Sequence, residues 1–192
     1  MARTRAFDHD TVLAAAIEQF WSSSYRGSST EDLCATANLS RSSLYNTFGS
    51  KRALYLEALL SYIAGKRRAR GELLDRELTG RELTHAVGAA VLDEQWTDPG
   101  RRACLALAAC IEVGQQDPEI TTVLETNAAD FDAVLALAIR RGQQDGTIRD
   151  DLPAEATARA VHAAFDGLQV RSRVATDRAS VEADLDAVIA LL

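Results

Sequence analysis

Apolar residues recur along most of the chain at steps of three and four positions, which is the spacing of one face of an α-helix. In the first such segment the apolar face consists of Val12, Leu13, Ala16, Ile17 and Phe20. Asp8 or Asp10 can cap the start of this helix, because a carboxylate there accepts a free backbone N–H. No segment has the strict alternation of a strand. The pattern therefore predicts an all-α protein.

Turn and capping residues divide this pattern into about nine helices. Pro118 and Pro153 each suit the first turn of a helix, because the backbone N–H that proline lacks is unpaired there anyway. After the first helix, which the segment SSSYRG ends, the expected ranges are about 28–37, 40–48, 51–78, 81–95, 101–116, 118–145, 153–175 and 178–192.

The second and third helices are short and closely spaced. Ser28, with Glu31 three residues later, fits a capping box that opens the second helix. Asn38 tolerates the left-handed conformation that ends this helix, Ser40 caps the third helix, and Gly49 terminates it. The tight turn between the two gives the outline of a helix-turn-helix motif.

The third helix is unusually polar for a helix of a globular core. Leu44 and Phe48 share one face, and Ser42 and Asn46 lie on the opposite face. Small residues and one amide on an outer face allow a helix to enter the major groove of DNA, which is about 12 Å wide. The alternative is a polar face that simply meets water. The tight turn, the basic flank and this spacing favour DNA.

The side-chain chemistry of this helix supplies candidate DNA contacts. Asn46 can pair with an adenine edge, and Arg41 can reach guanine or a phosphate. The hydroxyl and ammonium groups that can hold flanking phosphates belong to Ser43, Tyr45, Thr47 and Lys51.

The charge of the chain is unevenly distributed. Residues 1–70 contain ten Lys/Arg and six Asp/Glu, a net of +4, and residues 71–192 contain eleven and twenty-two, a net of −11; the two sum to −7. A basic end on an acidic body favours a nucleic-acid partner. Chance clustering is the alternative, because four of the positive charges lie in the segment KRRAR at 66–70.

Composition excludes several other classes. The longest apolar run has nine residues, 103–111, whereas a membrane span needs ~18. No apolar segment follows the charged start, so we expect no secretory signal, a cytoplasmic location and no membrane contact. The three cysteines are scattered, the histidines do not cluster, and CxxC, HExxH and GxGxxG motifs are absent. We therefore expect no metal, no cofactor and no enzymatic activity.

The segment YRGSSTEDLCATANLSRSSLYNTFGSKRALYLEAL, residues 25–59, resembles the DNA-binding domain of TetR-type transcriptional regulators. The match covers roughly residues 8–59. Ser42 stands where relatives often have Gly, and Asn46-Thr47 stands where they often have His. These departures lie on or beside the outward face, so they concern the operator sequence rather than the fold.

The resemblance implies a dimeric regulator, usually a repressor, which binds palindromic double-stranded operator DNA and is released by a small-molecule effector. It implies a helix-turn-helix DNA-binding domain over residues 1–50. It also implies an effector-binding and dimerisation domain over residues 51–192, with a homodimer formed through residues 153–192. A helical protein-interaction module is the remaining alternative.

The resemblance further implies which residues contact DNA outside the base edges. Arg3 and Arg5 would form an arm near the backbone or the minor groove. The residues implied to contact phosphates are Ser28 or Ser29, Ser43, Tyr45 and Lys51.

Candidate effector-pocket residues lie on inward positions of the following helices: Trp96, Leu105, Ala108, Glu112, Phe131 and Leu135. A few polar anchors in an apolar wall are typical of ligand pockets, and Glu112 is the one acid in its apolar helix. His162 and Phe165 share a face with Gln169 and are further candidates. The alternative is plain core or, for the last three, a dimer face. Gly167 in the same helix indicates close helix–helix packing.

Cys104 is a separate candidate. The segment RRACLALAACIEVGQQDPEI resembles a branch of the family in which a cysteine opens the sixth helix, and some members of that branch respond to electrophiles or oxidants. Arg101 and Arg102 lie within one turn, and a helix N-terminus also stabilises a thiolate. The alternative is that Cys104 serves as a small hydrophobic residue.

Overall fold

The computed structural model describes residues 8–192, and this range is helical, without strands, which confirms the expected all-α class. The helices are α1 (His9–Ser23), α2 (Thr30–Thr36), α3 (Arg41–Phe48), α4 (Lys51–Leu74), α5 (Gly80–Thr97), α6 (Leu105–Glu112), α7 (Pro118–Asp145), α8 (Ala154–Ser172) and α9 (Arg178–Ala190), with a short 3-10 turn η1 (Gly114–Gln116) after α6.

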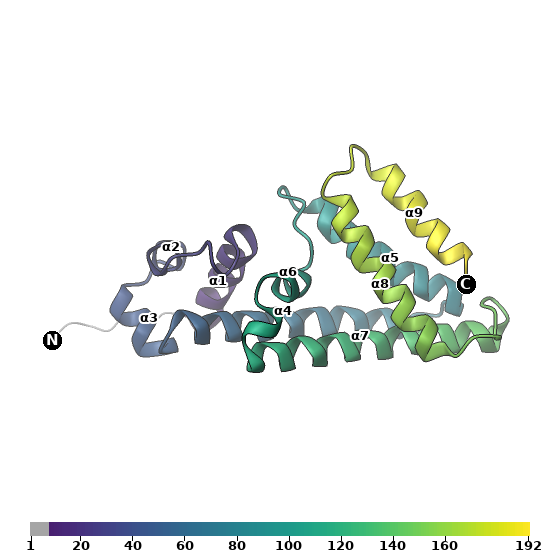
Figure 1. The fold of residues 1–192 in the computed structure, drawn as a ribbon, viewed down its shortest axis with the longest axis horizontal. Coiled ribbons are helices and arrows are strands. Elements are labelled where there is room, and N and C mark those ends of the chain that lie inside the picture. Colours follow the sequence, from purple (N-terminus) through teal and green to yellow (C-terminus); the bar gives the residue numbers. More distant parts are fainter. Residues whose placement is uncertain (1–7) are drawn as a thin grey trace.

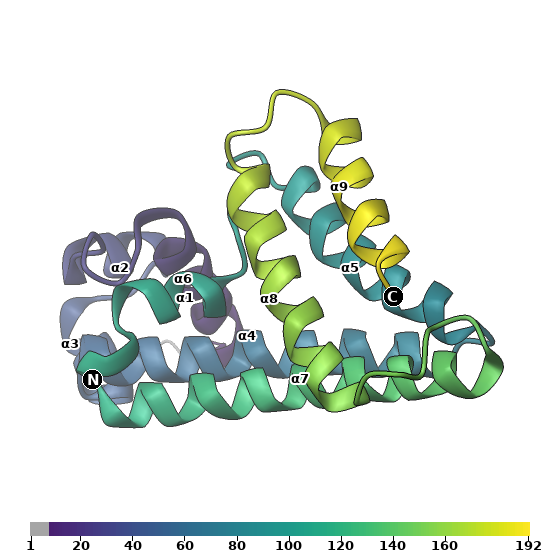
Figure 2. The same cartoon turned by 45° about the vertical axis from the view of Figure 1, so that its right-hand side comes forward.

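Two long helices, α4 and α7, run side by side and form the base of an elongated molecule (Figure 1). The bundle α1–α3 lies at one end of this base, and α5, α8 and α9 lie at the other. The short α6 lies between the two ends, above α4 and α7, as Figure 2 shows from a second direction. Any signal between the two ends therefore has three routes, along α4, along α7 or through α6.

The start of α2 differs from the expectation. Ser29, not Ser28, is the N-cap: its hydroxyl accepts the Asp32 N–H at 3.1 Å, and the Asp32 carboxylate accepts the Ser29 N–H at 2.9 Å. Ser28 is fully buried, and its hydroxyl donates to the carbonyl of Ser24 at 2.7 Å. The capping box is therefore real but lies one residue later than its predicted position.

The predicted turn residues have the expected backbone. Asn38 has φ of 51° at the end of α2, and Gly49 has φ of 75° at the end of α3. Both are in the region that L residues other than Asn and Asp rarely adopt. The tight turns on either side of α3 are therefore specified locally.

Helix α6 begins four residues later than expected, because tertiary hydrogen bonds hold residues 101–104 outside the helix. Gln169 accepts the backbone N–H of Cys104 at 2.8 Å, and the Ala103 carbonyl accepts the indole N–H of Trp21 at 2.6 Å. Asp98 accepts the Arg102 N–H at 2.8 Å. These hydrogen bonds satisfy backbone groups that would otherwise be paired within a helix.

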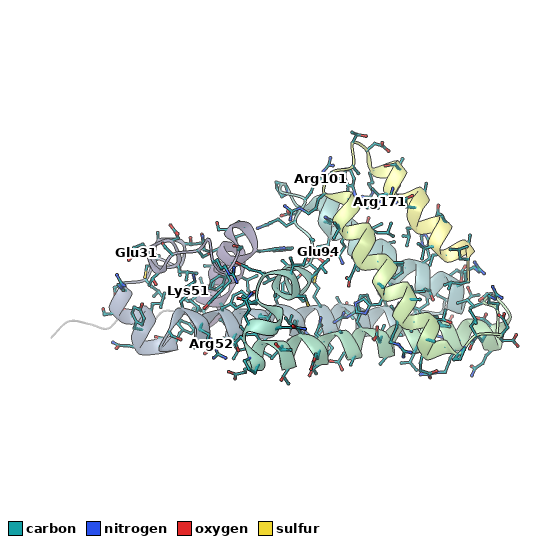
Figure 3. The ribbon with its side chains drawn as sticks, in the orientation of Figure 1. Glu31, Lys51, Arg52, Glu94, Arg101 and Arg171 are labelled. Atoms are coloured by element: carbon teal, nitrogen blue, oxygen red, sulfur yellow. The ribbon has the colours of Figure 1, made fainter. Side chains whose placement is uncertain are left out.

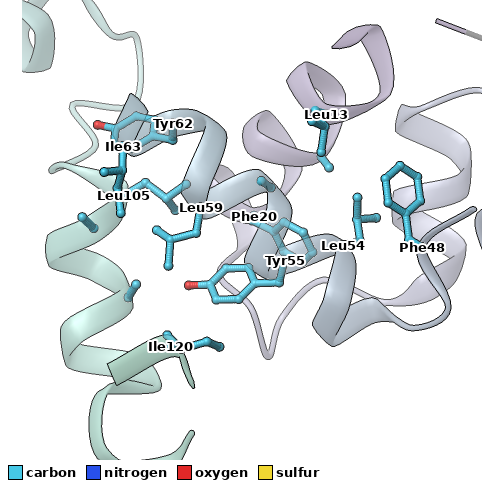
Figure 4. Packing of buried hydrophobic residues seen from close by; sticks show 14 of the residues in the cluster. Leu13, Phe20, Phe48, Leu54, Tyr55, Leu59, Tyr62, Ile63, Leu105 and Ile120 are labelled. Atoms are coloured by element: carbon cyan, nitrogen blue, oxygen red, sulfur yellow. The ribbon is translucent and has the colours of Figure 1, made fainter. Parts of the chain in front are cut away.

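The buried residues form two clusters. The first fills the space between α1–α3, the first half of α4, α6 and the start of α7, and Figure 4 shows part of it. Phe20 and Tyr55 lie at its centre with their rings edge to face, 4.9 Å apart. The second cluster joins α5, the rest of α7, α8 and α9. Helix α4 contributes to both, through Leu59 in the first and Leu73 in the second, so it links the two cores rigidly.

Candidate DNA-binding surface and effector cavity

Helix α3 lies at the outer end of the molecule (Figure 1). Leu44 and Phe48 are buried, with 0% and 4% of their surface exposed, whereas Ser42, Tyr45 and Asn46 are exposed. The apolar pair fixes α3 to the bundle and leaves the polar face outward. This is the arrangement that a helix needs in order to enter a major groove.

Hydroxyl groups secure the first turn of α3. The Ser40 hydroxyl accepts the Ser43 N–H at 3.0 Å and lies 2.9 Å and 2.8 Å from the hydroxyls of Ser42 and Ser43. The Thr47 hydroxyl donates to the Ser43 carbonyl at 2.9 Å. Within residues 8–192 the Asn46 amide has no hydrogen-bond partner, although it is exposed beside them. All donors and acceptors of the Asn46 side-chain amide are therefore available to a DNA base.

Arg41 and Tyr45 are held in an exposed polar group. Arg41 pairs with Glu31 at 2.8 Å, and its guanidinium lies 5.8 Å from the centre of the Tyr45 ring. Hydrogen bonds to the Thr30 hydroxyl and, to a smaller extent, to Arg41 lower the pKa of the Tyr45 phenol. An ion pair as exposed as Arg41–Glu31 contributes little to stability, so a phosphate can replace Glu31 at little cost.

The remaining predicted DNA contacts lie in different environments. Lys51 opens α4 and holds its ammonium group 4.5 Å from the centre of the Tyr25 ring (Figure 3). Ser29 is exposed at the start of α2. Ser28 is buried, so its hydroxyl is not available to a phosphate, and Ser29 is the candidate of the two that remains. Arg3 and Arg5 lie outside the described residues.

Glu112, a predicted pocket residue, connects α6 to the α1–α3 bundle. Its carboxylate oxygens accept the backbone N–H groups of Tyr25 at 2.8 Å and Arg26 at 2.7 Å, in the loop between α1 and α2. An acid at the end of an apolar helix is satisfied here by two backbone donors from a different part of the chain. We call this contact the Glu112 latch.

Two arginines make further long-range bonds, one between the α5–α6 loop and α1, and one between the starts of α4 and α7. Arg102 pairs with Glu18 of α1 at 2.6 Å and with Asp98, and its guanidinium lies 4.4 Å from the Trp21 ring centre. Arg52 donates to Asp117 at 2.5 Å and 2.7 Å, and this hydrogen bonding lowers the pKa of Asp117 to about 2.

A cavity of about 460 Å³ lies among α4, α5, α6, α7 and α8. Three of the predicted residues line it: Cys104, Phe131 and His162. Leu135 and Phe165 are instead core residues, 0% and 1% exposed. They contact neighbouring helices rather than an open space, and they do not line this cavity.

The other predicted pocket residues lie elsewhere. Leu105, Ala108 and Glu112 border a separate hollow between the end of α1 and α6, because α6 turns this face toward the α1–α3 bundle. Trp96 is half-buried outside the cavity, with the Arg101 guanidinium 3.8 Å from its ring centre. These four residues therefore do not line the cavity of about 460 Å³, although three of them border the second hollow.

Charged groups of the cavity wall come mainly from α4 and α8. Lys66 pairs with Glu94, and His162 lies 2.7 Å from Asp132 and 3.8 Å from Asp166. Burial raises the pKa of the Asp166 carboxyl. Arg70 also lines the cavity. Sequence inspection missed the α4 residues because KRRAR reads as a solvated basic run.

Cys104 is the N-cap residue of α6 and faces the cavity. The two nearby arginines are engaged elsewhere: Arg101 donates to the Ala175 carbonyl at 2.7 Å, and Arg102 pairs with Asp98 and Glu18. Of the two features expected to stabilise a thiolate at Cys104, the structure therefore retains the helix N-terminus but not the nearby arginines.

Residues 8–192 contain neither a candidate metal site nor a candidate membrane-spanning helix. No group of His, Cys, Asp and Glu side chains is arranged to hold a metal ion. No helix in this range has both the length and the apolar character that crossing a membrane requires.

Family models match both parts of the chain. The model of the bacterial regulatory proteins of the tetR family matches residues 12–58, and that of the tetracyclin repressor-like C-terminal domain matches residues 81–188. The second match alone covers more than half of the 192 residues.

Individual relatives match over nearly the whole length. YezE of Bacillus subtilis, an uncharacterized HTH-type transcriptional regulator, is 29% identical over 194 residues, which is 100% of both chains. A cysteine mutant of the TetR family regulator CifR, complexed with 26-bp double-strand operator DNA, is 28% identical, covers 98% of both chains and has a TM-score of 0.85. The reduced form of E. coli NemR shares the fold, at 22% identity, 94% and 95% coverage and a TM-score of 0.82.

Proposed function

The chain belongs to the TetR family of bacterial regulatory proteins and is thus a DNA-binding transcriptional regulator, and on this premise we propose that it is a repressor that a small molecule releases from its operator. The observation that carries the proposal is the double role of α6. This helix borders the effector cavity through Cys104 and holds the α1–α3 bundle through the Glu112 latch.

The DNA-binding part of the proposal places α3 in the major groove. Residues 1–50 form the DNA-binding domain, in which Asn46 reads a base edge and Arg41 contacts guanine or phosphate. Ser29, Tyr45 and Lys51 hold phosphates, which position the protein without selecting a sequence. The operator complex of CifR, at 28% identity over 98% of both chains, supports this placement.

A homodimer through residues 153–192 would present two such helices to a palindrome, about 34–36 Å apart. Small and apolar residues form an exposed stripe along α8 and α9 and just beyond their ends, in the half of the molecule away from α3 in Figure 1. The stripe consists of Ala160, Ala163, Gly167, Val170, Val174, Ala179, Ala183, Ala187 and Leu191. Among residues 8–192 no atom outside its own helix lies within 4 Å of a Cβ built at Gly167, which leaves room there for close packing by a second copy.

Release follows if the effector prefers an arrangement of α6 that weakens the latch. Only a difference in affinity between two states shifts their equilibrium. A difference of about 2–3 kcal/mol would weaken operator binding roughly 30- to 150-fold. By the same linkage, operator DNA must weaken effector binding by the same factor.

A second candidate is release by covalent modification of Cys104, which its place in the cavity wall favours. An electrophilic alkene is the suitable probe: the thiolate sulfur bonds to one alkene carbon, and a solvent proton adds to the other. N-Ethylmaleimide should release DNA from the wild type and from Cys110→Ser but not from Cys104→Ser. Release that persists in Cys104→Ser excludes this candidate.

The experiment for the main proposal selects bound fragments from a genomic library and measures their affinity by gel shift at several salt concentrations. Specific binding with a steep salt slope is the expected result, because phosphate contacts displace counterions. Absence of binding to any fragment would overturn the proposal in favour of a helical protein-interaction module.

A further inference from the structure

Arg70 is a half-buried cation in the wall of the cavity. It lies on α4, one turn after Lys66, and its guanidinium lies 4.6 Å from the centre of the Phe131 ring. Its single protein acceptor among residues 8–192 is the Asn127 side-chain oxygen, at 3.1 Å. A guanidinium has five N–H donors in a planar fork, so most of this capacity faces the cavity unused.

The other half-buried charges of the cavity wall are paired, whereas Glu72 and Arg76 lie exposed at its edge. Lys66 binds Glu94, and His162 lies between Asp132 and Asp166. No carboxylate of the described residues lies within ion-pair distance of Arg70. Loss of solvent lowers the pKa of the Arg70 guanidinium, as expected for a cation whose lost hydration no anion replaces.

The remainder of the wall is mostly apolar. The cavity of about 460 Å³ is bordered by Tyr62, Ile63, Leu73, Val91, Leu124 and Phe131. This volume falls within the range of about 300–1,000 Å³ for small-molecule sites. A molecule that fills it must therefore have an apolar body.

We propose that the effector is an amphipathic monocarboxylate whose carboxylate binds the free edge of Arg70 and whose apolar body lies between α4, α5 and α7. The inference rests on the proposed function, since it names the ligand class of the same cavity. The planar fork of arginine matches a carboxylate through two parallel hydrogen bonds. An unpaired cation in an apolar wall is costly on its own, and an anionic ligand offsets that cost.

The test is a calorimetric titration with matched probes: octanoate, decanoate and dodecanoate, each beside the alcohol and the amine of equal length. In the wild type at least one carboxylate should bind about tenfold more tightly than its alcohol. Arg70→Met should remove that preference and leave alcohol binding unchanged, and Arg70→Lys should retain part of it. The matched control is Arg68→Met, which removes an exposed charge of the same helix outside the cavity wall.

Three outcomes overturn the proposal: no carboxylate binds, the alcohols bind as well as the carboxylates, or Arg70→Met leaves the preference intact. Thermal melting of Arg70→Met confirms that the variant is folded, and Arg70→Lys provides a second variant if it is not. Gel shifts with the same probes keep the two hypotheses separate. An amine or alcohol that binds at least as tightly as the carboxylate of equal length and releases DNA leaves the repressor hypothesis intact but refutes the carboxylate hypothesis. If the wild type fails to bind DNA, the repressor hypothesis is refuted. The titration then still tests whether the cavity prefers a carboxylate.

Discussion

The DNA-binding surface and the effector cavity are built over different distances along the chain. The surface lies on one helix of eight residues, with a capping serine at one end and a glycine of positive φ at the other. The cavity draws its wall from five helices, and Tyr62 and Gln169, which both line it, lie more than a hundred residues apart. Residue type and spacing therefore specify the first site, whereas packing between distant helices specifies the second.

The largest difference between the two regions is expected in DNA binding after one core substitution in each of them. Leu44 and Leu135 are both fully buried, one under the DNA-binding surface and one in the second cluster. Each change to Ala should lower the free energy of unfolding by about 2–5 kcal/mol, through lost burial and the cavity left behind. Leu44→Ala should abolish specific DNA binding, because α3 depends on two buried side chains, whereas folded Leu135→Ala should retain it.

Denaturant unfolding and gel shifts on both variants provide the measurement. Val161→Ala offers a control of smaller volume change in the second cluster. Equal loss of DNA binding by the two leucine variants, at equal fractions folded, would show that the DNA-binding surface is not locally specified.

The next effect concerns single contacts on α3. Asn46→Ala should relax preference at one base pair and cost roughly 1–3 kcal/mol for the preferred site. Tyr45→Phe and Lys51→Ala should instead weaken binding about equally for all sequences, since their expected partners are phosphates. Binding to operators mutated at each position in turn distinguishes the two patterns. An Asn46→Ala variant with unchanged affinity and preference would refute the assignment of Asn46 to the groove.

Sequence inspection could find α3 because the relevant signals are local. The inward pair Leu44 and Phe48, the cap at Ser40 and the stop at Gly49 lie within ten residues. In the same region the sequence predicts the N-cap at Ser28 instead of Ser29, which is wrong by one residue. Two adjacent serines offer the same cap chemistry, and the hydrogen bond from Ser28 to Ser24 decides between them.

The same inspection placed few of the cavity residues correctly, for a physical reason. An apolar helix such as α6 has several faces that could be inward, and only its neighbours determine which one faces a cavity. Leu105 and Glu112 face the α1–α3 bundle, and Cys104 faces the cavity. Arg70 was missed because a basic run looks solvated until α7 covers one of its members with Phe131 and Asn127.

The Glu112 latch allows a test of how the two regions communicate. Glu112→Gln keeps the size of the side chain but leaves a single acceptor oxygen where the carboxylate offers two to the N–H groups of Tyr25 and Arg26. We expect the effect of a bound effector on operator affinity to shrink severalfold, since coupling between sites is typically about 1–3 kcal/mol. Titrations of operator with and without a cavity-binding probe measure this coupling.

Gln116→Ala is the matched control for the latch. Gln116 contacts the Arg26 side chain from the same segment but no backbone N–H of the α1–α2 loop. It should leave the coupling intact. If Glu112→Gln leaves it intact as well, the signal travels along α4 or α7, which both contribute to the two cores.

The smallest effect is expected from the charged contact between the starts of α4 and α7. Arg52 lowers the pKa of Asp117 from 3.8 to about 2 in the folded protein. Because the folded-state pKa lies below the unfolded one, the pair stabilises the fold fully above about pH 4, and this contribution is lost as the pH falls to about 2. Asp117→Asn removes the charge and keeps the N-cap of α7, since Asn caps a helix about as well as Asp.

Thermal melting between about pH 7 and pH 2 should show Asp117→Asn less stable than the wild type at neutral pH, with a difference that closes in acid. The difference should be small, because the pair is partly exposed and Arg52 retains Glu119 as a second partner at 2.9 Å. Glu125→Gln, an exposed acid of α7, controls for the loss of one charge. A difference that stays constant with pH would mean that the substitution acts through the helix cap. The ion pair would then not be what holds the starts of α4 and α7 together.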